Sequence, residues 1–390
     1  MTSRVPDSVV VARDTPLFRE SETGRLDKYP RATWARWALR LLIAAGYASL
    51  AVWFHLAAAG DWSGTANEAL AERIALLPET AVGSDVSVIG ALYPPITSII
   101  AIVVPGGPLG LGVMGALVAG LMVQLIAQSM KRKGFHPAVR WVFILTLATT
   151  PVFSYIVTTN FESVLALMFF GLGMVDLVRF VTWANTQAGF RAGILLACAA
   201  FSDTTATFSA LVAAFAGSVI IQSRPGARIA NAVVVAFPTI ALFGALALLG
   251  TAFDAGPFAM LRGGLEWNPE RAAAVLSLTT SLSGLVYFAP MIVMMIASIA
   301  LRYSGSGVIA ILLTLSTLLA YVLELTPPGN AGTTYTLLLL LAIAIVPTAT
   351  TLAHRALTCI VSVVLWVIGW FTAWQLSAIG AWLDVLGGAA

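Results

Sequence analysis

The chain has 390 residues, of which 59% are hydrophobic and only 10% are charged. Soluble domains carry about 25% charged residues, so the composition excludes an ordinary soluble protein. The formal net charge of +3 is too small to indicate a nucleic-acid surface. Apolar runs of about 18 or more residues recur along the chain, and each is long enough to cross a bilayer. We therefore predict an all-α polytopic membrane protein.

Residues 1–36 form a polar N-terminal segment with prolines at positions 6, 16 and 30. This composition is typical of a chain that is disordered or lies on the membrane surface. Lysine and arginine are frequent up to Arg40, so the positive-inside rule predicts a cytoplasmic N-terminus. The first apolar run begins near residue 37 behind this segment, and we expect it to remain as a signal anchor.

The first predicted span covers about 37–58, and the loop 59–92 then lies outside the cytoplasm. The next cytoplasmic marker is the basic stretch "KRKGFHPAVR" at 131–140. Two apolar pieces, 94–105 and 109–130, lie between them. If both crossed the membrane, the basic stretch would lie outside. The short piece 94–105 is therefore predicted to be an interfacial or re-entrant helix, and 109–130 to cross.

The remaining apolar runs predict a regular series of crossings with basic connectors inside and polar connectors outside. These spans are expected at about 139–158, 161–181, 188–202, 204–222, 229–252, 281–302, 306–323, 332–352 and 356–380. The total is about 11 transmembrane helices with the C-terminus outside. Residues 37–390 then form a single transmembrane domain in the plasma membrane, with external loops 59–108 and 253–280.

Acidic side chains gather on the predicted outer side. Asp61 comes shortly after the end of the first span, and Glu68 and Arg73 follow on a helix-prone stretch. Carboxylates at a membrane edge are costly to desolvate and are often functional. The alternative is a surface helix with solvated charges, capped by Ser63 or Thr65. Within the predicted spans, the acid Asp176 is expected to pair with Arg179.

The order of segments resembles the GT-C superfamily. The resemblance begins with "GD" at residues 60–61, a polar loop and "YPPITSII" at 93–100. It continues through "LMVQLIAQSMKRKGFHP", "TLATTPVFSYIVTTNFESVLALMFFGLGMVDLVRF" and "GILLACAAFSDTTATFSALVAAF", and it covers about 37–225. Members of the superfamily are integral-membrane glycosyltransferases that use polyprenyl-phosphate sugars. This chain departs from them in having Asn160 and Glu162 where an Asp is usual, and Asp203 where a Lys is common.

The resemblance implies inverting glycosyl transfer from a polyprenyl-phosphate sugar to a lipid-linked or cell-envelope glycan, at the outer membrane face. A mannosyl- or arabinosyltransferase of an actinobacterial-type envelope is the expected kind. Asp61 is the implied catalytic base, and Asp85 is the alternative. Arginines are the implied phosphate ligands, and other outer polar groups would contact substrate; together these substrate-binding candidates are Glu68, Arg73, Tyr93, Asn160, Glu162, Asp203, Arg262, Trp267 and Arg271.

Each of these residues also has a structural interpretation. Asn160, Glu162 and Asp203 suit helix caps, while Trp267 suits the interfacial aromatic belt and Arg271 suits a membrane-edge position. The expected partners are membrane lipids, the sugar donor and a glycan acceptor. No metal-ligand spacing is present, and a divalent cation is left open as a cofactor. Two other functions also stay open: a non-catalytic GT-C-like scaffold, and a transporter of lipid-linked glycans or small solutes.

Overall fold

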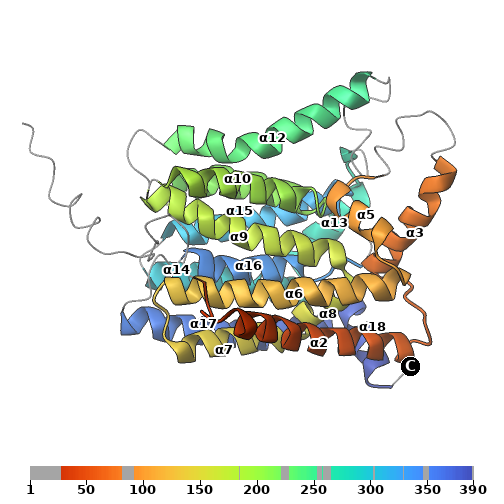
Figure 1. Ribbon diagram of the computed structural model, residues 1–390. Helices are drawn as coiled ribbons and strands as arrows, with labels where there is room; N and C mark the ends of the chain where they lie inside the picture. The colour runs from red at the N-terminus through yellow and green to blue at the C-terminus, as the bar shows by residue number, and fades with distance from the viewer. Residues whose placement is uncertain are drawn as a thin grey trace, which may run out of the picture.

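The computed structural model describes residues 28–80, 92–183, 185–220, 228–252, 257, 265–301, 304–327, 329–345 and 351–388. Within these ranges the secondary structure is helical, and no strand occurs. The long helices run side by side as a bundle (Figure 1). Four short helices gather at one end of it, which we call the α3 end: α3 (Ala66–Thr80), α5 (Pro95–Val103), α13 (Pro269–Leu278) and α18 (Ser377–Leu386).

Seven of the described helices are long and apolar enough to cross a membrane. They are α2 (Thr33–Ala57), α6 (Gly107–Arg132), α9 (Phe161–Trp183), α12 (Arg228–Ala252), α14 (Leu282–Ala300), α15 (Ser304–Val322) and α17 (Leu352–Gln375). Three further predicted spans correspond to shorter helices, α10 (Thr186–Ala200), α11 (Ala206–Ile220) and α16 (Thr333–Ile345). The prediction of a polytopic helical membrane protein is thus confirmed, while the count of 11 depends on these shorter helices also crossing.

The predicted continuous span 139–158 is broken in the structure. It consists of α7 (Pro137–Ala148) and α8 (Pro151–Thr159), which meet at a bend of 60°. Pro151 explains the break, because proline disfavours helical backbone at the residue before it, and Thr150 is accordingly extended, with φ −76° and ψ 127°. Every residue of α8 is buried. The bend therefore carries the start of α9 into the interior of the α3 end.

The last predicted span, 356–380, is also divided. Helix α17 ends at Gln375, and α18 begins at Ser377 after the extended residue Leu376, which has φ −90° and ψ 111°. The short α18 packs against α2, α8 and α17. It therefore helps to close the α3 end of the bundle instead of prolonging the span.

The described residues on either side of 81–91 have the local structure that was predicted for them. Helix α5 is short, as expected for 94–105, and begins with Pro95 at its first position. The Thr65 hydroxyl accepts the backbone N–H of Glu68 at 3.3 Å, so Thr65 caps α3 as expected. The expected pair of Asp176 and Arg179 is also confirmed, with an Nη1–Oδ1 distance of 2.9 Å.

Exposed tryptophans mark both ends of α2. Trp37, near its start, is 55% exposed, and Trp53, near its end, is 61% exposed. The 16 residue steps from Trp37 to Trp53 correspond to about 24 Å of helix, which approaches the ~30 Å hydrocarbon thickness of a bilayer. Tryptophan is enriched at both membrane–water interfaces. The spacing on α2 therefore fits a helix that crosses a membrane from one interface to the other.

Candidate functional site

Buried polar side chains meet at the α3 end of the bundle. The junction of α8 and α9 contributes Glu162 and Ser163, the turn between α10 and α11 contributes Asp203, α3 contributes Arg73, and the segment before α16 contributes Asn330. We call these five residues the carboxylate cluster. Both carboxylates are at most 2% exposed. Carboxylates are rarely buried unless they are paired, so their partners define the chemistry of the cluster.

Arg73 pairs with Glu162. Its Nη2 lies 2.7 Å from Glu162 Oε1 and also donates to the Ser98 hydroxyl at 3.1 Å. The Nε and Nη1 atoms of Arg73 are buried and make no hydrogen bond. A guanidinium offers five N–H donors, so Arg73 retains buried donors that an anion could use.

Both carboxylate oxygens of Asp203 accept hydrogen bonds. The Ser163 hydroxyl donates to Oδ2 at 2.5 Å, and the backbone N–H of Thr205 donates to Oδ1 at 2.8 Å. Burial raises the pKa of Asp203, and the nearby Glu162 carboxylate raises it further, while hydrogen bonds from Ser163 and Thr205 offset part of this effect. Asp203 is thus a stronger proton acceptor than an exposed aspartate.

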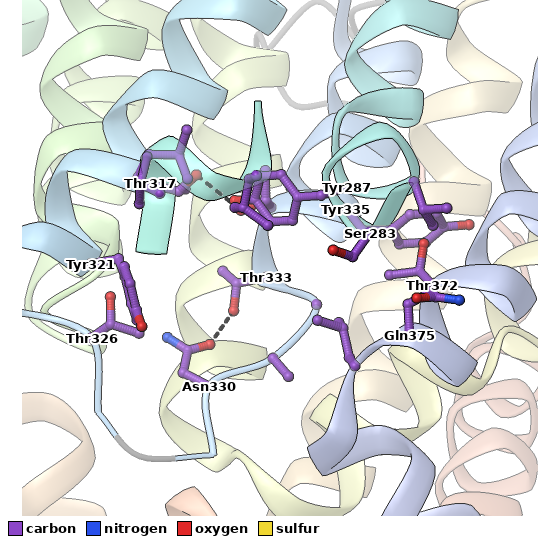
Figure 2. Close-up of a pocket in the computed structure, with 18 of the residues that line it drawn as sticks. Ser283, Tyr287, Thr317, Tyr321, Thr326, Asn330, Thr333, Tyr335, Thr372 and Gln375 are labelled. Atoms are coloured by element: carbon purple, nitrogen blue, oxygen red, sulfur yellow. Dashed lines mark hydrogen bonds between the residues drawn. The ribbon is translucent and has the colours of Figure 1, made fainter. Parts of the chain in front are cut away.

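Asn330 connects this cluster to a cavity. Its Nδ2 donates to the Thr205 hydroxyl at 2.8 Å, and its Oδ1 lies 3.2 Å from the Ser163 hydroxyl oxygen. The Thr333 hydroxyl donates to the same Oδ1, as Figure 2 shows. Asn330, Thr205 and Thr333 all line the cavity. A short chain of hydrogen bonds therefore leads from the buried Asp203 to the cavity wall.

The cavity has a volume of about 420 Å³ and lies among α13, α14, α15, the segment before α16, and the end of α17. We call it the pocket. Most of its wall is apolar, and hydroxyl and amide groups, including those of Tyr287, Tyr321, Tyr335 and Gln375, are set into that wall (Figure 2). None of its described lining residues carries a charge. Pockets are specified by a few placed polar groups among apolar ones, so this lining suits a neutral ligand that has both apolar surface and hydrogen-bonding groups.

A shallower hollow of about 400 Å³ adjoins the pocket and shares Tyr321, Thr326 and Asn330 with it. Arg271 is the charged residue among those that line this hollow. Its Nη1 donates to the carbonyl of Tyr321 at 3.1 Å, and its guanidinium lies 5.1 Å from the centre of the Tyr321 ring. The predicted phosphate ligand Arg271 is thus placed beside the neutral pocket.

A third cavity of about 360 Å³ is largely apolar and is lined by residues of α11 and α12 together with Tyr93. We call it the apolar groove. The Tyr93 ring packs edge-on against Phe201 and Phe243, and its hydroxyl donates to the Ala200 carbonyl at 3.3 Å. Tyr93 is therefore a wall of this groove and does not line the pocket.

The predicted base Asp61 lies away from these cavities, because it is exposed and lines none of the three. Its Oδ1 accepts the backbone N–H of Ser63 at 2.8 Å, and this hydrogen bond lowers the pKa of Asp61. A lowered pKa makes it a weaker base. Glu68 lies near Asp61 and Glu72, and partial burial raises the pKa of Glu68.

The other predicted site residues differ in their surroundings. Asn160 is buried at the cluster, and its Nδ2 donates to Asn330 Oδ1 at 3.4 Å. Trp267 is 63% exposed and lines none of the three cavities. Asp85 and Arg262 lie outside the described residues.

Several residues of the site were missed by the sequence analysis. Ser163, Thr205 and Asn330 are uncharged, and the tyrosines of the pocket are scattered through apolar helices. One signal was available in "ELTPPGNAGTTY" at 324–335, a polar stretch with Pro and Gly between two apolar runs. Loops of this kind carry functional groups more often than the elements they connect.

In the described part of the chain, no group of three or more His, Cys, Asp or Glu side chains could hold a metal ion. No protein-family model matches the chain, and no curated protein or solved structure matches it either. A functional assignment therefore depends on the chemistry of the pocket and its surroundings.

Proposed function

We propose that the chain is a membrane-embedded glycosyltransferase of GT-C type. It moves a sugar from a polyprenyl phosphate to a lipid-linked or cell-envelope glycan. One observation carries the proposal: an uncharged pocket lined by hydroxyl, amide and aromatic groups lies between Arg271 and the buried Asp203. A sugar needs neutral hydrogen-bonding partners, its phosphate needs a cation, and the acceptor hydroxyl needs a base.

The transfer is a single displacement in which Asp203 accepts the proton. The acceptor oxygen bonds to the anomeric carbon as the bond from that carbon to the phosphate oxygen breaks. The electron pair leaves with the polyprenyl phosphate, whose charge Arg271 stabilises. The acceptor proton passes to the Thr205 hydroxyl, which lines the pocket, while the proton of that hydroxyl passes to Asp203. One displacement inverts the anomeric centre.

The apolar groove supports a lipid-borne donor. It lies between α11 and α12, and its walls include Phe208, Leu211 and Phe243. Helix α12 has only 22% of its apolar stretch buried, so much of it faces the surroundings of the bundle. A hydrocarbon chain could pack against these apolar walls as it packs against lipid tails, and the groove would hold the polyprenyl part of the donor.

The proposal includes an orientation. The N-terminus is cytoplasmic, and the α3 end faces outward from the plasma membrane, with about 11 crossings in all. The distribution of basic residues supports this orientation. The end opposite to α3 carries Arg36 and Arg40 at the start of α2, and Lys131 and Arg140 around the end of α6. Cytoplasmic connectors are enriched in such bases.

A non-catalytic protein that binds a glycolipid is the second candidate. The observation that favours it is the absence of any carboxylate among the described residues that line the pocket. A transporter is less well supported, because the pocket lies at one end of the bundle, whereas transporters bind substrate near the bilayer midplane.

The test is a complementation experiment in cells that lack the native copy. We expect Asp203→Asn to lower the amount of product glycan by about 100-fold, the usual contribution of a general base. The matched control is Asp61→Asn, which we expect to leave the product unchanged because Asp61 is exposed. The readout is mass spectrometry of lipid-linked and envelope glycans, with membrane insertion measured for each variant.

Three outcomes separate the candidates. Normal product from a well-inserted Asp203→Asn protein would exclude Asp203 as the base. Loss of product with Asp61→Asn but not with Asp203→Asn would identify Asp61 as the catalytic base. If purified protein binds glycolipid but the envelope glycans of the deletion strain are unchanged, the chain is a binding protein and not a transferase.

A further inference from the structure

A group of cations surrounds Tyr29 at the end of the bundle opposite to α3. Lys131 Nζ lies 4.1 Å from the centre of the Tyr29 ring, and the Arg140 guanidinium carbon lies 4.9 Å from it. Gln124 joins Arg40 to the same place: its Oε1 accepts from Arg40 Nε at 3.0 Å, and its Nε2 donates to the Tyr29 carbonyl at 2.6 Å. We call these five residues the Tyr29 site.

The positive charge of the Tyr29 site is not neutralised within the described part of the chain. Among the described residues, ion pairs join Glu162 to Arg73, and Asp176 to Arg179 and Arg191. None of these pairs involves Arg40, Lys131 or Arg140. Arg140 is only 8% exposed, yet its Nε makes no hydrogen bond. Three like charges held together are unfavourable by themselves, so the site is complementary to an anion.

The depth of the site in the membrane identifies the source of that anion. Trp34 and Trp37 at the start of α2, and Trp141 at the start of α7, are all more than half exposed. Arg40 lies over the ring of Trp37 at 4.9 Å. Exposed tryptophans lie at the level of the lipid headgroups. The cations of the Tyr29 site therefore lie where lipid phosphates are concentrated.

We propose that the Tyr29 site binds the phosphate of an anionic glycerophospholipid in the leaflet at this end. Lys131, whose side chain is exposed, donates to a phosphate oxygen, and the Arg140 guanidinium on the same Tyr29 ring adds positive charge. Basic pockets between transmembrane helices are known to hold such headgroups. The site does not depend on the proposed transferase activity, because the pocket lies at the other end of the bundle.

The experiment uses the purified full chain in nanodiscs and measures retained lipid by native mass spectrometry, with phosphatidylglycerol and phosphatidylcholine supplied in equal amounts. We expect the unmodified protein to retain phosphatidylglycerol preferentially. Lys131→Gln should weaken this preference about fivefold, and the double variant Lys131→Gln/Arg140→Gln should weaken it about 25-fold, since each basic residue contributes a similar factor.

Two control proteins show whether the effect belongs to the site. Arg228→Gln removes an exposed base at the start of α12, at the same end of the bundle, and should keep the preference. Lys131→Arg/Arg140→Lys keeps both charges and should also keep most of it. A protein with altered folding would lose the lipid in this charge-conserving variant as well.

Other outcomes would overturn the proposal. These are equal retention of the two lipids by the unmodified protein, or an unchanged preference in Lys131→Gln. A third arm offers glycerol 3-phosphate as competitor. If this soluble phosphate displaces phosphatidylglycerol at comparable concentration, the site recognises a free phosphate and the assignment to a lipid is wrong.

Discussion

Lys133 is a fully buried lysine at the end of α6. Its Nζ donates to the carbonyls of Ile343 at 2.7 Å and Ala344 at 2.5 Å, which belong to the last turn of α16. The final carbonyls of a helix have no partner within it. Burial lowers the pKa of Lys133 to about 7. A neutral amine still has two N–H groups, one for each carbonyl, so the folded protein keeps both hydrogen bonds when Lys133 loses its charge.

We expect this lysine to make the protein more stable as the pH rises from about 7 towards 10.5, between its folded pKa and its ordinary value. In this window the unfolded chain binds the proton and the folded protein does not, so the free energy of unfolding increases with pH. Thermal unfolding in detergent over this range measures the slope. Lys133→Met should lose the slope and about 1–3 kcal/mol of stability, while Lys28→Met keeps both. An unchanged slope in Lys133→Met would contradict the assignment.

Prediction at single residues was most successful where a charged side chain has its partner within one turn of the same helix. Asp176 and Arg179 are three residues apart and meet as a pair, because residues at this spacing share a helix face. Asp61 shows the opposite case. An aspartate next to a span end can be buried or exposed depending on which other segments cover it, and no nearby residue reveals that.

Helix α6 packs unusually closely against its neighbours through glycine. A methyl group added at Gly115 would lie 2.2 Å from the Val157 carbonyl oxygen of α8, and one added at Gly120 would lie 2.3 Å from the Arg40 carbonyl oxygen of α2. Small residues at such positions let membrane helices approach one another. This packing holds the buried α8 against α6, and α8 in turn positions the start of α9 with Glu162 and Ser163.

We therefore expect Gly115→Ala to lower stability by about 1–3 kcal/mol, the usual effect of overpacking a core. The control is Gly46→Ala on α2, where nothing lies within 4 Å of an added methyl group and no loss is expected. Thermal unfolding of the two purified variants in the same detergent compares them. A Gly115→Ala protein as stable as the Gly46→Ala protein would show that α6 and α8 are not in this contact.

At the scale of the whole molecule, the two ends of the bundle differ in chemistry. The α3 end holds the carboxylate cluster, the pocket and its adjoining hollow, whereas the opposite end holds the Tyr29 site and the buried Lys133. The long helices α2 and α6 run along the bundle between its two ends (Figure 1), so these two groups of residues are separated by the length of the bundle. A substrate in the pocket and an anionic lipid at the Tyr29 site would therefore lie on opposite faces of the membrane.

This separation predicts a labelling pattern for single cysteines introduced after both native cysteines are replaced. Ser63→Cys lies at the α3 end and Ala138→Cys at the opposite end, and both positions are exposed. We expect a membrane-impermeant maleimide to label Ser63→Cys in intact cells and Ala138→Cys only after permeabilisation. The reverse pattern would invert the proposed orientation, and labelling of both in intact cells would exclude a membrane between the two ends.

The helical membrane class and most helix positions followed from the sequence by itself. The predicted span 229–252 agrees with Arg228–Ala252, and Thr65 was one of the two caps expected before α3, with Ser63 as the other. Hydropathy, caps and prolines act over a few neighbouring residues, and they can therefore be read from local sequence. The broken span at Pro151 was also visible in principle, because the proline stands in the middle of the apolar run.

The tertiary structure alone decided which polar groups form a site. Asp203, Ser163 and Asn330 come from three separate segments, and their contact depends on how α9, α11 and α16 pack. Whether an aspartate is buried, and whether its pKa rises or falls, depends on solvent access and neighbouring charge. Both are set by residues distant in the chain, which is why Asp203 and not Asp61 emerged as the buried carboxylate beside the pocket.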